Sequence, residues 1–148
     1  MIDIFEFATV VMTGLLAGAL LTEAFILVPY WKKMPSDEFL RLHHTMSPSL
    51  FRYYAPLTVA GSALPIITSS LYFNLYGGNW SWWFMSGFCA ISLLGFYFGF
   101  FKNANLAFAT GKDPKIAQAI LEKWALLHNM RTVIAVVGFV ASLAAYGT

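Results

Sequence analysis

Four long apolar stretches alternate with polar segments along the chain. They lie near residues 5–31, 51–75, 82–102 and 122–147. At 1.5 Å per helical residue, each stretch is long enough to cross a hydrocarbon layer of about 30 Å. The pattern therefore predicts an all-α protein in which residues 1–148 form a single integral membrane domain, a bundle of four transmembrane helices.

Prolines and turn residues refine the expected helix boundaries. Pro56 and Pro65 in the second stretch predict a kink without an interruption, because membrane helices tolerate proline where neighbouring groups satisfy the freed carbonyls. The segment Gly111-Lys112-Asp113-Pro114 predicts a turn, with Pro114 at the start of the last helix. That helix would continue without a break through the fourth stretch.

A short interfacial helix is predicted between the first two spans. Ser36 is a candidate cap, the acidic residues Asp37 and Glu38 would follow in the first turn, and the helix would end before Pro48. One face, expected on the bundle or the membrane surface, would carry Phe39, Leu42, His43 and Met46. The opposite face would carry Asp37, Arg41 and His44, so His44 is expected to face solvent.

The composition agrees with a membrane protein. Hydrophobic residues make up 59% of the chain and charged residues 11%, which excludes a disordered chain and an ordinary soluble domain. A net charge of +2 gives no reason to expect a nucleic-acid partner. The single cysteine, Cys89, excludes an internal disulfide and a redox or zinc-binding cysteine pair.

The basic residues predict the orientation in the membrane. Four spans place both termini on one side, and the segments 32–50 and 103–121 share the other. All nine basic residues lie in or next to these two segments: Lys32, Lys33, Arg41, Arg52, Lys102, Lys112, Lys115, Lys123 and Arg131. By the positive-inside rule, these segments would be cytoplasmic and both termini would lie outside, in what we expect to be a bacterial inner membrane.

Aromatic residues near the span ends predict belts at the two membrane interfaces. The outer belt would contain Tyr76, Trp80, Trp82 and Trp83, and the inner belt Tyr30 and Trp31. The short turn from Tyr76 to Asn79 would make the second and third spans antiparallel neighbours.

Polar residues inside the spans converge at one depth. Counting 1.5 Å per residue from Lys32 and Lys123, Glu23 lies roughly 13 Å and Arg131 roughly 12 Å below the inner interface. An unpaired charge at that depth is costly, so we expect Glu23 and Arg131 to pair directly or through one intermediary. His128 would lie one turn from Arg131 on the same stripe.

Further residues are expected around these charges. Trp124 continues the stripe of His128, His43 would lie above it, and Asn103 and Asn105 follow the third span. Nearly every polar side chain of the membrane region would then belong to the inner half. Two simpler interpretations stay open: a structural ion pair that fixes helix register, and an Arg131 side chain that reaches lipid phosphates.

At these residues the sequence resembles the anthrone oxygenase-like family of small four-helix membrane proteins, most of which have no assigned function. Gly14, Gly18 and Pro29 are similar to the family's Gly-rich opening and its proline at the helix end. Asn103-x-x-Leu106 is similar to its Asn-x-x-Leu signature. Trp124-x-x-x-His128-x-x-Arg131 is similar to its Trp-x-x-x-Asn-x-x-Arg pattern. The chain departs from the family at His128, where members commonly carry Asn, and at Phe101, where they carry proline.

The resemblance implies an activity on a hydrophobic substrate taken from the lipid bilayer. Characterised relatives oxidise an activated, phenolic anthrone to the quinone with O2 as co-substrate and without an obvious bound cofactor. In this picture His128 or Glu23 would take a proton from the substrate, while Arg131 and Asn103 would hold the resulting oxyanion. His43, Asn105 and Trp124 would help to bind the aromatic substrate.

A second interpretation is a membrane redox protein that binds metal. Glu23, His43 or His44, and His128 supply the carboxylate and imidazole groups that suit iron or copper. A haem held by His43 and His128 is a variant of this interpretation.

A third interpretation is a non-catalytic subunit or adaptor. The motif Gly14-x-x-x-Gly18 permits close helix approach, within the bundle or in a homo-oligomer.

Overall fold

The structure, a computed structural model, describes residues 2–76 and 82–146 and is helical almost throughout. The helices form four long rods. The first comprises α1 (Ile2–Thr22), the π-helical turn η1 (Glu23–Leu27) and α2 (Val28–Lys33). The second is α3 (Ser36–Tyr76), the third comprises α4 (Trp82–Phe96), the π-helical turn η2 (Tyr97–Phe101) and α5 (Lys102–Thr110), and the fourth is α6 (Pro114–Tyr146). All four are long and apolar enough to cross a membrane, which confirms the predicted four-helix membrane bundle.

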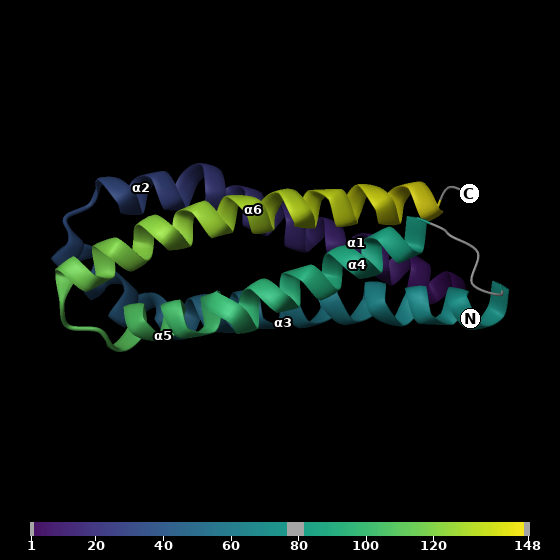
Figure 1. Cartoon of the computed structure of the whole chain (residues 1–148), viewed down its shortest axis with the longest axis horizontal. Helices are drawn as coiled ribbons and strands as arrows, with labels where there is room; N and C mark the ends of the chain where they lie inside the picture. The colour runs from purple at the N-terminus through teal and green to yellow at the C-terminus, as the bar shows by residue number, and fades with distance from the viewer. Residues whose placement is uncertain (1, 77–81, 147–148) are drawn as a thin grey trace.

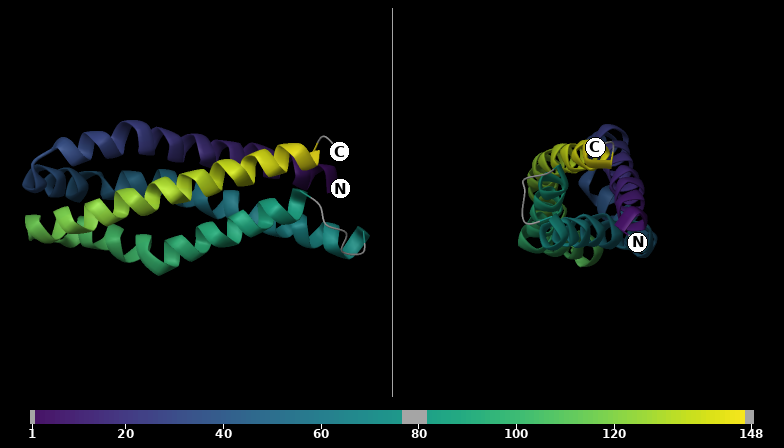
Figure 2. Two further views of the ribbon diagram at one scale, coloured as in Figure 1. Left: turned by 45° about the horizontal axis from the view of Figure 1, so that its top comes forward. Right: turned by 90° about the vertical axis from the view of Figure 1, so that its right-hand side faces the viewer.

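The four rods form a closed ring when viewed along the bundle (Figure 2). Around the ring, α1 packs on α3, α3 on α4, α4 on α6, and α6 on α1. Figure 1 shows both chain ends at one end of the bundle and the connections α2–α3 and α5–α6 at the other. We call these the terminal end and the basic end. All nine basic residues belong to the half of the bundle at the basic end, as the sequence predicted.

The expectation of a separate interfacial helix before Pro48 is wrong. The helix begins at Ser36 and carries acidic residues in its first turn, as predicted, but it continues through Pro48 as one helix of 41 residues. Proline removes only one backbone hydrogen bond, and α3 packs on α1, α4, α5 and α6 over its length, which holds the helix together there. The Ser36 hydroxyl donates to the Gln118 side chain on α6 and is not the predicted cap.

The predicted start of the last helix is confirmed. Helix α6 begins at Pro114 and runs unbroken for 33 residues. Asp113 caps this helix, because its Oδ1 atom accepts a hydrogen bond from the backbone N–H of Lys115 at 2.9 Å. An ion pair of 3.2 Å between Lys32 and Glu122 joins α2 to α6 close to this start.

The two halves of the bundle are packed differently. Near the basic end, large rings from four helices form the core, among them Trp31, Phe39, Phe101, Phe108 and Trp124. Near the terminal end, helices are joined by hydroxyl pairs, Thr9–Thr68 at 2.8 Å and Thr13–Ser142 at 3.0 Å. The expectation that nearly all polar groups of the membrane region belong to the inner half is therefore wrong, because small hydroxyl side chains also bond helix to helix.

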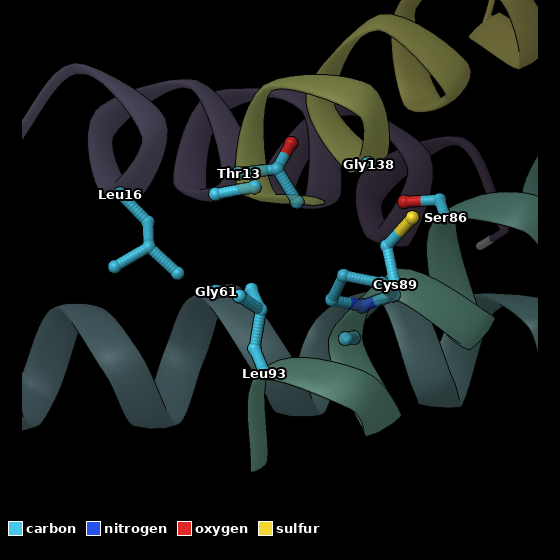
Figure 3. Close-up of a pocket in the computed structure, with 10 residues that line it drawn as sticks. Thr13, Leu16, Gly61, Ser86, Cys89, Leu93 and Gly138 are labelled. Carbon is cyan, nitrogen blue, oxygen red and sulfur yellow. The ribbon is translucent and has the colours of Figure 1, made fainter. Parts of the chain in front are cut away.

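Between the two halves the helices approach one another closely around a cavity of only about 10 Å³ (Figure 3). Gly61 and Gly138 belong to its lining, and a Cβ atom at either glycine would lie 3.0 Å or less from a neighbouring side chain. Cys89 and Ser86 line the same cavity from α4. The middle of the bundle is thus a tight crossing of all four rods.

The predicted aromatic belts are only partly right. Tyr30 and Trp82 are exposed, but Trp31 and Trp83 are buried in the core. Consecutive helical residues point about 100° apart, so of these adjacent aromatic pairs one residue faces outward and the other packs in the core. The predicted turn at 77–79, Trp80 and the side chain of Tyr76 lie outside the described residues.

Candidate functional site

A buried carboxylate and a buried imidazole meet between the first and last rods. Glu23 is the first residue of the π-helical turn η1, and His128 lies near the middle of α6. Glu23 is 6% exposed and His128 is 0% exposed. The Oε2 atom of Glu23 lies 3.7 Å from Nδ1 of His128. The two rods therefore bring an acid and a base to one level of the bundle.

The contacts of His128 indicate which of its ring nitrogens carries the hydrogen. Its Nε2 atom lies 3.2 Å from the backbone carbonyl of Leu20. A carbonyl oxygen only accepts, so Nε2 carries a hydrogen and donates it. In the neutral ring, Nδ1 then presents a lone pair, and this atom has no hydrogen-bond partner among the described residues. Glu23 is the acidic group that faces that lone pair, so the two residues can take up one proton between them.

Arg131 completes the group of ionisable residues. It is 8% exposed and is the one buried residue among the nine basic residues, all of which the structure describes. Its guanidinium lies 4.8 Å from the centre of the Phe101 ring and interacts electrostatically with Glu23. The ion pairs found among the described residues include none between Glu23 and Arg131 within 4.0 Å. The contact to Glu23 is instead made by His128, one turn earlier on α6.

Two tyrosines that the sequence analysis did not select lie near this group. Tyr54 of α3 interacts electrostatically with both Glu23 and Arg131. Tyr97, the first residue of η2, interacts electrostatically with Arg131. The signal available in the sequence is a phenol hydroxyl inside each of two apolar spans, which by itself does not separate these residues from the other tyrosines.

π-helical turns flank the site on two rods. Glu23 begins η1, and Phe101, whose ring lies beneath the Arg131 guanidinium, ends η2. Such turns insert one extra residue into a helix and are frequent at functional sites. Both turns lie beside the same segment of α6. The regular α-helical hydrogen bonding is therefore interrupted at one level of the bundle on two rods.

An aromatic cluster covers the site on the side of the basic end. The Trp124 ring stacks on the His128 ring at 4.7 Å between centroids, with planes 8° apart. Its indole N–H donates to Asn105 at 3.0 Å. Trp31 packs edge-on against Trp124 and also against His43. His43 is thus separated from the Glu23–His128 pair by two indole rings.

Several expected site residues are not brought together. Asn103 is exposed, whereas Arg131 is buried. His44 is exposed and its ring lies 2.9 Å from the backbone carbonyl of Gly111, whereas His43 interacts with the carbonyl of Phe39. Among residues 2–76 and 82–146, no three His, Cys, Asp or Glu side chains are grouped as metal ligands. The proposed ligand set of Glu23, His43, His44 and His128 therefore does not converge on one centre.

The chain has no match among protein-family models, curated proteins or solved structures. The likeness of Trp124, His128 and Arg131 to the anthrone oxygenase-like pattern thus depends on those positions alone. A helix bundle does not imply a function by itself. The chemistry of the buried site is accordingly the basis for the function proposed below.

Proposed function

We propose that this protein is a membrane-embedded, oxygenase-like enzyme that deprotonates a hydrophobic, phenol- or anthrone-like aromatic substrate and lets the resulting anion react with O2. The observation that carries this proposal is the buried Glu23–His128 pair, in which the Nδ1 lone pair of His128 faces the carboxyl group without a hydrogen-bond partner among the described residues. A buried base with one free position is what proton abstraction requires.

The surrounding groups have separate roles in this reaction. The Leu20 carbonyl and the Trp124 ring hold the His128 ring in one tautomer and one orientation. Arg131 supplies a positive charge at the same level of the bundle, which would stabilise an anion formed by removal of the substrate proton. Its own side chain is kept in place by the Phe101 ring. Asn103, being exposed, has no role in the proposed reaction.

The proposed reaction is balanced with O2 as the only oxidant. An anthrone carries two hydrogens on its central methylene carbon. The first leaves as a proton to the Glu23–His128 pair, and the carbanion then transfers electrons to O2. One oxygen atom becomes the new ketone of the quinone, and the other leaves as water with the two hydrogens. The protein supplies the base and the charge, and it returns to its starting protonation state.

The surroundings suit such a substrate. The four apolar helices around the site are long enough to cross a lipid bilayer. A flat, poorly water-soluble ring system would dissolve in the same bilayer. In this proposal the basic end faces the cytoplasm, since eight exposed basic residues gather there and cytoplasmic loops are rich in Lys and Arg. The site then lies in the inner half of the membrane.

The experiment is oxidation of 1,8-dihydroxyanthrone by the purified protein in lipid nanodiscs, followed by quinone absorbance and O2 uptake. Empty nanodiscs give the rate of spontaneous oxidation. We expect one O2 consumed per quinone formed. Glu23→Gln and His128→Asn should each lower the protein-dependent rate by about 10²- to 10⁴-fold, the usual cost of losing a general base.

A matched control separates chemistry from folding. Glu6→Gln makes the same substitution on α1 near the terminal end, where Glu6 accepts a hydrogen bond from Tyr72. This variant should keep the wild-type rate. No protein-dependent quinone formation, or equal rates for wild type and Glu23→Gln, would refute the proposal. Loss of stability alone in Glu23→Gln would favour the structural ion-pair interpretation.

A further inference from the structure

A lateral groove of about 600 Å³ lies between the first rod and α3. Gly18, Thr22 and Leu27 line it from the first rod, and Leu50, Tyr53 and Tyr54 line it from α3. Its volume is within the range of about 300–1,000 Å³ found for small-molecule sites in proteins. The groove is separate from the small cavity at the centre of the bundle, since the two share no lining residue.

The groove opens sideways, towards the lipid. Leu15 and Tyr53 at its edges are 54% and 57% exposed. At Gly18 an added Cβ atom would meet no atom within 4 Å, so the missing side chain contributes open space to the groove. A molecule dissolved in the bilayer can therefore enter without passing through water.

A second copy of the chain is a poorer fit to this groove than a small molecule. At Gly14 an added Cβ atom would lie 2.9 Å from the Phe139 ring, so Gly14 already serves the packing of α1 on α6 inside the bundle. Of the predicted Gly14-x-x-x-Gly18 contact face, only Gly18 faces open space. A close helix–helix contact through both glycines would have to displace Phe139.

Tyr54 connects the groove with the buried acid and base. Its side chain lines the groove and interacts electrostatically with Glu23 and Arg131. The Tyr53 and Tyr54 rings stand at 89° to each other with centroids 5.0 Å apart, which gives the groove an aromatic corner. Thr22, also in the lining, directly precedes Glu23 in the chain.

We propose that this groove binds a flat phenolic molecule from the bilayer, with its rings against Gly18 and the tyrosine corner and its hydroxyl towards Tyr54. The inference rests on the proposed function for the use of the bound molecule, but binding can be measured without turnover. Tyr54 is a positioning residue in this arrangement, placed between the bound phenol and the Glu23–His128 pair.

The test is photolabelling of the full chain in lipid nanodiscs with 4-hydroxybenzophenone, a bilayer-soluble phenol that forms covalent adducts on irradiation. Mass spectrometry locates the adducts. We expect saturable labelling on the groove-lining segments around Leu15 and Leu50, prevented by excess 1-naphthol. Gly18→Leu should lower this labelling at least about tenfold, because a leucine side chain fills the groove.

The control is Gly95→Leu, which adds the same side chain at another exposed helical glycine with no atom within 4 Å of its Cβ position. It should leave labelling of the groove unchanged. Labelling that 1-naphthol does not prevent, or that Gly18→Leu does not reduce, would overturn the inference. A third result would also overturn it: a wild type that is dimeric and shows no groove labelling, together with a monomeric Gly18→Leu variant. A second copy of the chain would then be the occupant of the groove.

The same samples separate this inference from the proposed function. Glu23→Gln should be labelled like the wild type while its quinone formation is lost. Saturable groove labelling in a wild type that forms no quinone would contradict only the proposed function. Quinone formation that depends on Glu23 but leaves the groove unlabelled would contradict only the inference.

Discussion

Glu23 and His128 lie buried side by side, so the contribution of each to the stability of the bundle depends on the other. This dependence is measurable as a coupling free energy. We expect Glu23→Gln and His128→Asn, made singly and together, to be non-additive in the free energy of unfolding by about 0.5–3 kcal/mol. Unfolding in bicelles, followed by steric trapping, provides the measurement.

The control for this cycle combines His128→Asn with Glu6→Gln. Glu6 also lies on the first rod, but it accepts a hydrogen bond from Tyr72 near the terminal end. Among the hydrogen bonds of the described residues, Glu6 and His128 have no common partner. These two substitutions should be additive within about 0.5 kcal/mol. Additive effects in the Glu23–His128 cycle as well would show that the two residues do not interact.

Arg131 differs from the other basic residues in burial, and this difference sets the cost of its removal. We expect Arg131→Leu to lower the free energy of unfolding by about 3–5 kcal/mol, because Glu23 would lose the buried cation that interacts with it. Lys123→Leu is the matched change on α6, where the ammonium lies over the Phe100 ring but is exposed. It should cost less than about 1 kcal/mol. Equal losses in the two variants would disprove the role of burial.

The start of α6 depends on one side chain. Asp113 accepts the backbone N–H of Lys115, and no other side chain caps this helix start among the hydrogen bonds of the described residues. Asp113→Ala should therefore speed amide hydrogen exchange in the first turn of α6 by about 2- to 30-fold, the equivalent of 0.5–2 kcal/mol. Lys112→Ala, at the neighbouring exposed position, should change this exchange less than about twofold. Equal changes would indicate that the cap is not formed.

Two glycines of α4 test how closely α3 and α4 approach. A Cβ atom at Gly87 would lie 2.4 Å from Oγ and 3.0 Å from Cβ of Ser69, whereas at Gly95 it would meet nothing within 4 Å. Gly87→Ala should lower stability by about 1–3 kcal/mol. Gly95→Ala should raise it by about 0.5–1 kcal/mol, because alanine is the better helix former. Thermal unfolding in nanodiscs shows whether each variant is more or less stable than the wild type. A Gly87→Ala variant more stable than the wild type would rule out the close approach of α3 and α4.

Much of the architecture could be predicted from the sequence because it depends on properties of long segments. The four spans and the start at Pro114 follow from hydropathy and helical rise, and so does the meeting of Glu23 with the polar stripe of His128 and Arg131 at one level of the bundle. Pro48 was misinterpreted because a local helix breaker is overruled by packing along α3. Trp31 was misplaced because interfacial preference and core packing favour the same residue type.

The features of the site that the sequence analysis did not predict were missed for a different reason. The π-helical turn at Glu23 leaves no mark in composition or period, since one extra residue in a helix is set by contacts with the neighbouring rods. Tyr54 is 74 positions from His128 in the chain, and only the packing of α3 brings it near Glu23 and Arg131. Asn105 was expected beside the substrate but instead accepts the indole hydrogen of Trp124.

The bundle divides into a half in which hydroxyl pairs join the helices and a half that contains the buried ionisable residues. Hydroxyl pairs such as Thr9–Thr68 and the small residues around the central cavity hold the terminal half together. The π-helical turns and the buried charges belong to the other half, and the lateral groove extends from the crossing into it. Because the rigid crossing of the helices lies between them, the site can contain irregular helix geometry without loss of the overall arrangement.

The same division gives the molecule a strong charge asymmetry, and this asymmetry predicts its orientation. Eight exposed basic residues lie at the basic end, so that end should face the cytoplasm. Lys115→Cys and Tyr146→Cys place a thiol at exposed positions near opposite ends of α6, and the native Cys89 is buried. On intact cells a membrane-impermeant maleimide should label Tyr146→Cys only, and Lys115→Cys should react after permeabilisation. The reverse pattern would place the Glu23–His128 pair in the outer half of the membrane, because the pair lies in the same half of the bundle as Lys115.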